Sequence, residues 1–320
     1  MNKIEYPRIV FMGTPDFAVA TLKALVDANY NVVGVITAPD KPAGRGQAIK
    51  QSPVKEYALA NSLAVLQPEK LKNPDFIETL RTLKADLQIV VAFRMLPEVV
   101  WNMPPIGTFN LHASLLPQYR GAAPINWAVI NGEKVTGVTT FFLQHEIDTG
   151  SVIFSREVII EDEDCAGTLH DKLMNVGCEL VVKTVDGIIN NTINPQPQPI
   201  PTEPLKNAPK IFKESCKVDW NNQSHTIVNL VRGLSPYPSA WSELILPSGI
   251  TTTFKIFKAK ACETKNLKVG EIETDGKTFV KVGSLSSDIE LLNIQLAGKK
   301  HLELKELLRG FKFETGARVQ

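Results

Sequence analysis

The stretch IVFMG, residues 9–13, is a short apolar run that ends on a glycine, and it decides the fold class. Two similar runs follow, VVGVIT at residues 32–37 and LQIVVA at residues 87–92. Apolar residues at helical spacing lie over residues 17–26, between the first two runs. Apolar runs without alternation indicate strands that are buried on both faces. Such strands, alternating with helices, predict an α/β fold with a mostly parallel sheet that is covered on both faces.

A sheet of this kind binds its ligands beyond the carboxyl ends of its strands. The segment TFNLH, residues 108–112, has the pattern of a further strand that ends there. Because side chains alternate along a strand, Asn110 and His112 point to the same face, roughly 6.5 Å apart along the backbone. A carboxamide and an imidazole on one face can stabilise a developing oxyanion and transfer a proton. Asn110 and His112 are therefore candidate catalytic residues.

Asp148 is the third candidate catalytic residue. It begins the turn Asp-Thr-Gly at residues 148–150, between further predicted strands at residues 136–142 and 151–158. A carboxylate there can orient His112 and favour its charged form. Two alternatives are a turn aspartate that caps backbone amides and an aspartic-protease site. The second alternative requires a second such motif, and the sequence has none.

Other common chemistries are disfavoured. Neither G-x-G-x-x-G nor G-x-x-x-x-G-K-[ST] occurs, which argues against an NAD site and a P-loop. The four cysteines are widely spaced and form no C-x-x-C pair, which disfavours a zinc ribbon and predicts reduced thiols in a cytoplasmic protein. The amino terminus lacks an apolar signal core and no long apolar run follows, so we expect neither secretion nor a membrane span.

A basic loop follows the second predicted strand. Its sequence, PDKPAGRGQAIK at residues 39–50, is rich in glycine and carries Lys41, Arg45 and Lys50. Glycines permit mobility, and these three side chains can contact phosphates. The alternative is an ordinary solvated loop.

Residues 194–204 contain five prolines, which predict an extended connector. We therefore expect domains at residues 1–191 and 210–320, joined by a linker at residues 192–209. A helix with Thr168 as N-cap is predicted over residues 168–185, before the connector. After the connector, a helix at residues 224–233 and short alternating strands at residues 253–258 and 278–282 suggest a small β-barrel.

The charge is divided unevenly along the chain. Residues 1–204 hold 17 Lys and Arg against 22 Asp and Glu, whereas residues 205–320 hold 18 against 12. The net charges are thus −5 and +6. A basic second half indicates a polyanionic partner, and a solvated lysine-rich surface is the alternative.

Together these motifs resemble the methionyl-tRNA formyltransferases of the folate-dependent formyltransferase superfamily, over nearly the whole chain. The Asn-x-His core alone marks the superfamily, and the basic loop with the C-terminal domain narrows the resemblance to the tRNA enzymes. The matching segments are FMGTPDFA (11–18), PDKPAGRG (39–46), SPVK (52–55), NLHASLLP (110–117), RGAAPI (120–125), DTG (148–150), VDW (218–220) and PYP (236–238).

The resemblance implies a Rossmann-like catalytic domain followed by a smaller OB-like, tRNA-binding domain. It implies that Asn110, His112 and Asp148 transfer a formyl group from 10-formyltetrahydrofolate to the α-amine of initiator methionyl-tRNA, without a metal. It also implies that Arg45 reaches the tRNA acceptor end. A monomer without an obligatory protein partner would suffice. The folate contacts would come from the turn after the catalytic strand: Ser114, Leu115, Leu116 and Pro117.

Three alternatives stay open at this point. The first is another folate-dependent N-formyltransferase, acting on an amino sugar or on glycinamide ribonucleotide. The second is a formyl-folate hydrolase, in which water replaces the amine. The third is an inactive RNA-binding homologue, against which the intact set of Asn110, His112 and Asp148 speaks.

Overall fold

The computed structural model describes residues 7–43, 48–201 and 203–320. These residues form two compact units that interleave along the chain. The first unit comprises the residues up to Gly121, Thr136–Val158 and His170–Lys206, and the second comprises Ala122–Val135, Ile159–Leu169 and Asn207–Gln320. The domain boundaries expected from the sequence, 1–191, 192–209 and 210–320, stay a prediction. No helix within the described ranges is both long and apolar enough to cross a bilayer.

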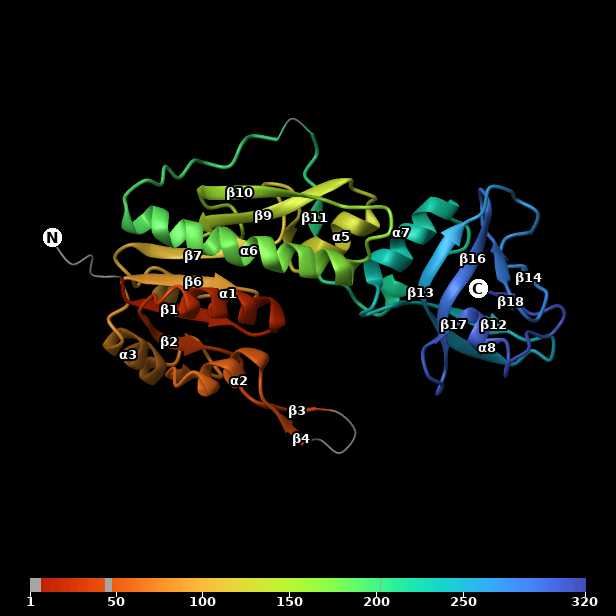
Figure 1. Cartoon of the computed structure of the whole chain (residues 1–320), viewed down its shortest axis with the longest axis horizontal. Helices are drawn as coiled ribbons and strands as arrows, with labels where there is room; N and C mark the ends of the chain where they lie inside the picture. Colours follow the sequence, from red (N-terminus) through yellow and green to blue (C-terminus); the bar gives the residue numbers. More distant parts are fainter. Residues whose placement is uncertain (1–6, 44–47, 202) are drawn as a thin grey trace. The chain divides into compact units, whose positions relative to one another are not determined.

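The first unit is built on a seven-stranded sheet with the order β10-β9-β7-β6-β1-β2-β5 (Figure 1). The strands from β7 to β5 in this order pair in parallel, and β9 runs antiparallel to β7. This arrangement confirms the predicted α/β class. The strands are β1 (Ile9–Gly13), β2 (Val32–Ile36), β5 (Val65–Leu66), β6 (Leu87–Val91), β7 (Gly107–His112), β9 (Val135–Phe142) and β10 (Val152–Ile159).

Helices cover both faces of this sheet. Val10, Met12 and Val90 pack on one face with apolar residues of α3 and α4. On the other face α6 packs so closely on β7 that a Cβ at Gly177 would lie 2.9 Å from Leu111 Cδ2. Figure 1 shows α1 and α6 crossing this second face. The helices are α1 (Asp16–Asp27), α2 (Pro53–Ala60), α3 (Pro74–Thr82), α4 (Glu98–Trp101) and α6 (Ala166–Ile189).

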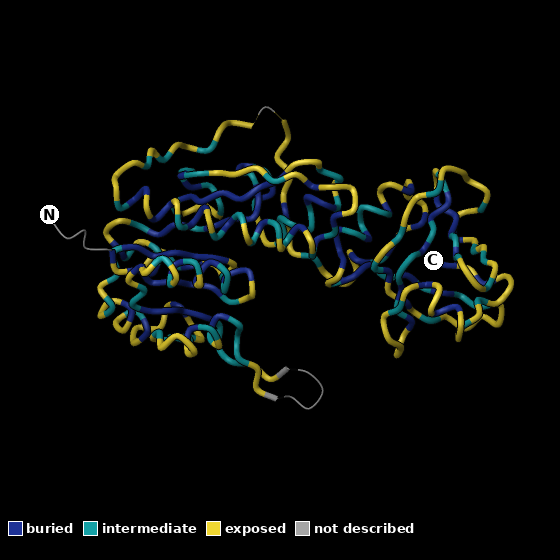
Figure 2. The backbone as a smooth tube through the Cα atoms, in the orientation of Figure 1, coloured by how far each residue is buried: buried dark blue, intermediate teal, exposed yellow. Residues whose placement is uncertain are grey.

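The central strands are buried along their whole length, as their apolar runs predict. Every residue of β1 and of β6 is buried, and Figure 2 shows exposed residues gathered on the loops and outer helix faces. Two-sided burial of both strands leaves only their ends free to meet a ligand. The sheet thus offers its carboxyl edge as the place for chemistry.

The start of α6 differs from the prediction. The helix begins at Ala166, so Thr168 lies in its first turn and is not the N-cap. Its hydroxyl oxygen accepts a hydrogen bond from the backbone N–H of Cys165 at 3.0 Å and donates one to Asp164 Oδ1 at 2.9 Å. A side chain in the third helical position that reaches back to the preceding amide performs half of a capping box. The N-cap prediction was therefore wrong by three positions, although Thr168 does stabilise the helix start.

The second unit is an antiparallel sheet with the order β14-β15-β16-β13-β12-β18, and β17 pairs with β16. The outer strands meet at an isolated bridge between Glu271 and Arg318, and Val319 N–H donates to Gly270 O at 2.9 Å. The sheet is therefore almost closed, as the predicted small barrel requires. The strands are β12 (Ala240–Ile245), β13 (Thr251–Ala261), β14 (Ile272–Thr274), β15 (Val280–Gly283), β16 (Asp288–Leu296), β17 (Leu302–Glu303) and β18 (Arg318–Val319).

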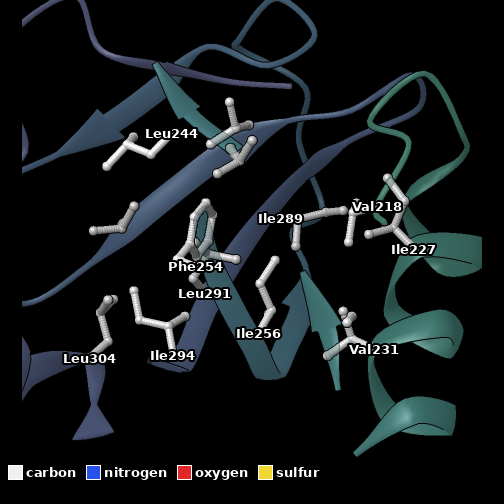
Figure 3. Close-up of a cluster of buried hydrophobic side chains, with 14 of the residues drawn as sticks. Val218, Ile227, Val231, Leu244, Phe254, Ile256, Ile289, Leu291, Ile294 and Leu304 are labelled. Carbon is white, nitrogen blue, oxygen red and sulfur yellow. The ribbon is translucent and has the colours of Figure 1, made fainter. Parts of the chain in front are cut away.

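The barrel encloses an apolar core that one helix completes. Figure 3 shows Ile227 and Val231 of α7 (Ser224–Leu234) reaching towards Ile256 and Ile289 of the sheet. All four side chains are at most 1% exposed. The remaining elements are short: β3 (Lys41–Ala43), β4 (Ala48–Lys50), β8 (Arg120–Gly121), α5 (Pro124–Ile130), β11 (Asn207–Ala208), the 3₁₀ helix η1 (Glu214–Cys216) and α8 (Leu304–Leu307).

We expect Leu80→Ala to lower the free energy of unfolding by roughly 2–5 kcal/mol, because it leaves a cavity in the fully buried cluster under α3. Leu59 of α2 is 52% exposed, so Leu59→Ala is the matched control and should change stability by less than about 0.5 kcal/mol. Urea denaturation followed by circular dichroism measures both values. Equal effects of the two substitutions would contradict this account of the core.

Candidate active site

Asn110 and His112 lie at the carboxyl end of β7, as the strand alternation predicts. In the parallel register Asn110 is opposite Val90 of β6, whose side chain belongs to the cluster with α3 and α4. Asn110 and His112 therefore point to the α3–α4 face, while Leu111 between them points to α6. His112 is the last residue of the strand and is only 6% exposed. The imidazole thus lies in a sheltered position at the edge where this fold class binds ligands.

The hydrogen bond of the imidazole determines which of its nitrogens is available. Nε2 of His112 lies 2.9 Å from the carbonyl oxygen of Tyr119. A carbonyl oxygen can only accept, so Nε2 carries a proton and donates it. Nδ1 faces Asp148 Oδ2 at 4.0 Å, which is longer than a hydrogen bond. Nδ1 is therefore the ring nitrogen that a reacting group can approach.

The Asp148 carboxylate is anchored to the backbone of a second loop. Its Oδ2 accepts a hydrogen bond from the N–H of Gly121 at 3.0 Å. The side chain is 12% exposed, and the residue has a positive φ of 55°. The expected pairing with His112 stays a prediction, because Oδ2 and Nδ1 are farther apart than a hydrogen bond. The carboxylate oxygen that accepts the hydrogen bond from Gly121 N–H is also the one that faces the imidazole.

The Asn110 carboxamide keeps its oxygen available for a ligand. Its Oδ1 is buried and has no hydrogen-bond partner among the described residues. Leaving a buried acceptor unpaired costs about 1–3 kcal/mol, so such an atom marks a place where a ligand can donate a hydrogen bond. An amide also offers two N–H donors. Asn110 can therefore interact both with an amine and with a developing negative oxygen.

The turn expected to contact folate follows directly after the catalytic strand, but its side chains are largely buried. The hydroxyl of Ser114 donates to the carbonyl of Gln118 at 2.7 Å, and Ser114 is fully buried. Leu115 packs against Gly137, where a Cβ would lie 2.6 Å from Leu115 Cδ2. Leu116 is also buried, and the peptide bond to Pro117 is cis. Backbone groups are thus the main functional groups that this turn can present to a ligand.

The basic loop forms a hairpin of β3 and β4, in which Lys41 pairs with Lys50 in the register. Both lysines are exposed. At the base of the hairpin Lys55 Nζ lies 2.6 Å from Asp40 Oδ2, and its hydrogen bond, with a second one from Gln67, lowers the pKa of Asp40. Arg45, the third predicted phosphate contact, lies outside the described residues.

Several residues that build the site had no strong signal in the sequence. The carbonyl of Tyr119 and the N–H of Gly121 orient His112 and Asp148 through their backbone atoms, which any residue type provides. Gln198 donates to the backbone carbonyl of Asp148 at 2.7 Å. Its position in the proline-rich segment does not distinguish it in the sequence from Gln196. Among the residues with described positions, no three His, Cys, Asp or Glu side chains gather as a metal site would require.

Comparisons with known proteins agree with this architecture. The family described as "Formyl transferase" matches residues 7–185, and "Formyl transferase, C-terminal domain" matches residues 210–312. The fold and the site thus define an enzyme of formyl transfer. A methionyl-tRNA formyltransferase of Bacteroides thetaiotaomicron is 59% identical over 320 residues, covering 99% of each chain. One of Flavobacterium johnsoniae is 52% identical over 317 residues, covering 99% of this chain and 100% of the relative. The chain belongs to the methionyl-tRNA formyltransferase family.

Solved structures with the same fold are more distant in sequence. A Helicobacter canadensis N-formyltransferase, in complex with folinic acid and dTDP-3-aminofucose, superposes with a TM-score of 0.61 at 21% identity, covering 91% of this chain and 99% of that one. HypX from Aquifex aeolicus, in complex with tetrahydrofolic acid, gives a TM-score of 0.63 at 20% identity. That match covers 96% of this chain but only 47% of HypX. At these identities the likeness concerns the fold alone.

We expect Gly150→Ala to lower the formylation rate roughly 10- to 100-fold, because small misplacements of catalytic groups have effects of that size. A Cβ at Gly150 would lie 1.6 Å from the carbonyl oxygen of Phe142, so the loop that carries Asp148 must move. Gly310→Ala is the matched control, since a Cβ there meets no atom within 4 Å. Steady-state rates and thermal unfolding midpoints test both variants. A Gly150→Ala enzyme with wild-type activity would show that the loop position is unimportant.

Proposed function

We propose that this protein transfers the formyl group of 10-formyltetrahydrofolate to the α-amine of initiator methionyl-tRNA. The observation that carries this proposal is the 59% identity, over the full length of both chains, to a methionyl-tRNA formyltransferase. The structurally similar sugar N-formyltransferase, at 21% identity, shares only the fold. Among the alternatives left open by the sequence, the tRNA substrate is therefore favoured over an amino sugar.

The reaction exchanges one carbon–nitrogen bond for another. The neutral amine attacks the formyl carbon, and the new carbon–nitrogen bond pushes the carbonyl electrons onto oxygen. When this oxyanion collapses, the bond between the formyl carbon and the folate nitrogen breaks. The amine loses one proton and the departing nitrogen gains one, so atoms and charge balance. No external oxidant or reductant is needed.

Asn110 and His112 are proposed to bind the oxyanion. Because Nε2 of His112 is committed to the carbonyl of Tyr119, the proton that faces the reaction is the one on Nδ1 of the charged ring. Asp148 Oδ2, 4.0 Å from Nδ1, stabilises that positive charge and leaves room for a group that contacts both. Donors held in place before the reaction stabilise developing charge without reorganisation. The unpaired Oδ1 of Asn110 is suited to accept a hydrogen bond from the attacking amine.

We propose that the folate donor lies against the turn of Ser114, Leu115, Leu116 and Pro117. Two findings support a folate-derived donor: the match to the formyl transferase family and the fold shared with HypX, whose structure contains tetrahydrofolic acid. The Ser114 hydroxyl is already bonded to the carbonyl of Gln118. The N–H of Leu116 and the carbonyl of Ser114 also bond to the hydroxyl of Thr139. The proposed contacts of this turn are therefore made by its remaining backbone groups.

In the second unit, a cavity of about 610 Å³ combines lysines with aromatic rings, and we propose it as part of the tRNA platform. Lys213, Lys255, Trp241 and the 82%-exposed Tyr237 line it. The Lys213 ammonium lies 5.8 Å from the centre of the Trp241 ring. Lysines attract phosphates and aromatic faces stack on bases, so this combination is typical of RNA-binding surfaces. Lys41 and Lys50 of the hairpin, together with Arg45 outside the described residues, are proposed as a second set of phosphate contacts.

We also propose that the protein is cytoplasmic and acts as a monomer. All four cysteines are free, as expected in a reducing compartment. Asn110, His112 and Asp148 come from one chain, so no second protein is required to complete the trio.

We expect His112→Ala and Asn110→Ala each to lower the rate of formylation on the order of 10²–10³-fold, because each removes one oxyanion donor. The measurement is single-turnover formylation of charged initiator tRNA with labelled formyl donor. His225→Ala is the control, since His225 is an exposed residue of α7 in the other unit. If the rate of His112→Ala stays within about threefold of wild type, the loss is far smaller than expected and the assignment is wrong.

We expect the affinity for tRNA to fall steeply with salt, because bound lysines release counterions from the phosphates. Lys213→Gln and Lys255→Gln should each reduce the slope of log affinity against log salt by about one, if each lysine contacts a phosphate. Lys134→Gln is the control, because Lys134 is already paired with Asp162 at 2.5 Å. Fluorescence titrations at several salt concentrations give the slopes. Unchanged slopes for both cavity variants would exclude this surface from the platform.

A further inference from the structure

The proline-rich segment does more than connect two parts of the chain. We define the strap as residues 194–201 and 203–206, which comprise the described part of this segment and the two residues after it. Its Gln196 exchanges two backbone hydrogen bonds with Val152, at 2.7 and 2.9 Å, beside the edge strand β10 (Figure 1). Further along the strap, the carbonyl of Lys206 accepts the N–H of Tyr119 at 2.6 Å. The strap is thus attached beside the loop of Asp148 and directly to Tyr119, whose carbonyl accepts the hydrogen bond of His112.

Between these two attachments, the side chain of Gln198 contacts both loops of the candidate site. Its Nε2 donates to the carbonyl oxygens of Asp148 at 2.7 Å and Gly150 at 3.1 Å. Its Oε1 accepts from Arg120 Nε at 3.2 Å and from Nη2 at 2.6 Å. Two donated and two accepted bonds use the whole hydrogen-bonding capacity of a carboxamide. Gln198 is therefore held in one orientation.

The partners of Gln198 are the immediate neighbours of the catalytic contacts. Arg120 lies between Tyr119, whose carbonyl accepts from His112, and Gly121, whose N–H donates to Asp148. On the other side, Gln198 binds the backbone of Asp148 itself. One carboxamide therefore joins the loop that carries the carboxylate to the loop that orients the imidazole. The 4.0 Å separation of Asp148 Oδ2 and His112 Nδ1 depends on how these two loops are held together.

The backbone at Asp148 needs such support. Its φ of 55° lies in the left-handed region, which is unfavourable for a residue with a side chain although Asp adopts it more readily than most. The hydrogen bonds from Gln198 to the carbonyls of Asp148 and Gly150 stabilise this turn from outside. Prolines at positions 195, 197 and 199 restrict the strap before it binds, which lowers the entropy lost on ordering Gln198.

We propose that Gln198 is a positioning residue for formyl transfer, which aligns Asp148 with His112 through the strap. This inference rests on the proposed catalytic roles of those two residues. Gln198 touches neither reacting group in this account. Its loss should therefore slow the chemical step while leaving the binding of both substrates unchanged.

The first test compares Gln198→Ala with Gln196→Ala. Gln196 is the matched control, because its side chain makes only a 3.2 Å contact to Asn194 within the strap. We expect Gln198→Ala to lower kcat roughly 10- to 100-fold with both KM values within about threefold, and Gln196→Ala to behave as wild type. A wild-type kcat for Gln198→Ala, or a rise in KM alone, overturns the proposal.

Gln198→Glu separates positioning from simple attachment of the strap. The carboxylate still accepts from Arg120 but cannot donate to the carbonyls of Asp148 and Gly150. We expect it to lower kcat as Gln198→Ala does, with an unchanged thermal unfolding midpoint. This variant also provides the test if Gln198→Ala does not fold. A wild-type kcat for Gln198→Glu shows that the link to the Asp148 loop is unnecessary and overturns the proposal.

A double-mutant cycle identifies the residue through which Gln198 acts. If it acts through Asp148, then Gln198→Ala should lower the rate by less than about threefold in an Asp148→Asn background. An equal loss in both backgrounds overturns the proposal. A wild-type rate for Asp148→Asn alone refutes the catalytic role of Asp148 and, with it, the inference. A slow Asp148→Asn enzyme beside a fully active Gln198→Ala enzyme refutes the inference only.

Discussion

The alternation of side chains along β7 is the constraint on which the rest of the site depends. Phe109 and Leu111 are at most 3% exposed and hold the strand against α6, which obliges Asn110 and His112 to face the opposite side. A shift of one residue in the register would bury the carboxamide and the imidazole under α6. Pairing with β6 on one side and β9 on the other prevents that shift. One face of β7 therefore packs against α6, and the opposite face carries Asn110 and His112.

Backbone groups hold the imidazole of His112 and the carboxylate of Asp148. The carbonyl of Tyr119 selects the protonated nitrogen of His112, and the N–H of Gly121 holds the carboxylate of Asp148. The roles proposed for Asn110, His112 and Asp148 are electrostatic, and such stabilisation requires donors that are already in place when charge develops. The Gln198 carboxamide extends this principle by tying both loops together. The candidate site is therefore organised in two layers: side chains on the strand and the turn, and amide groups that orient them.

The second unit differs from the first in its architecture and in the side chains on its surface. Its nearly closed barrel buries an apolar core and leaves lysines and aromatic rings on the outside. Lys213 and Lys217 both lie within 6 Å of the Trp241 ring, so positive charge and a stacking surface occur together. Positive charge beside aromatic rings suits a polyanion with accessible bases, which agrees with the RNA platform proposed for this unit.

The sequence by itself determined the parallel sheet, the shared face of Asn110 and His112, and the basic barrel, because these depend on apolar periodicity and on composition. Tertiary structure alone decided the protonated nitrogen of His112, the N3 position of Thr168 and the contacts of Gln198. Gln198 meets Asp148 across 50 positions and Arg120 across 78. Contacts so distant along the chain leave no local pattern, and those to Asp148 and Gly150 are made to carbonyls, which every residue has. Only the folded chain brings these groups within hydrogen-bonding distance.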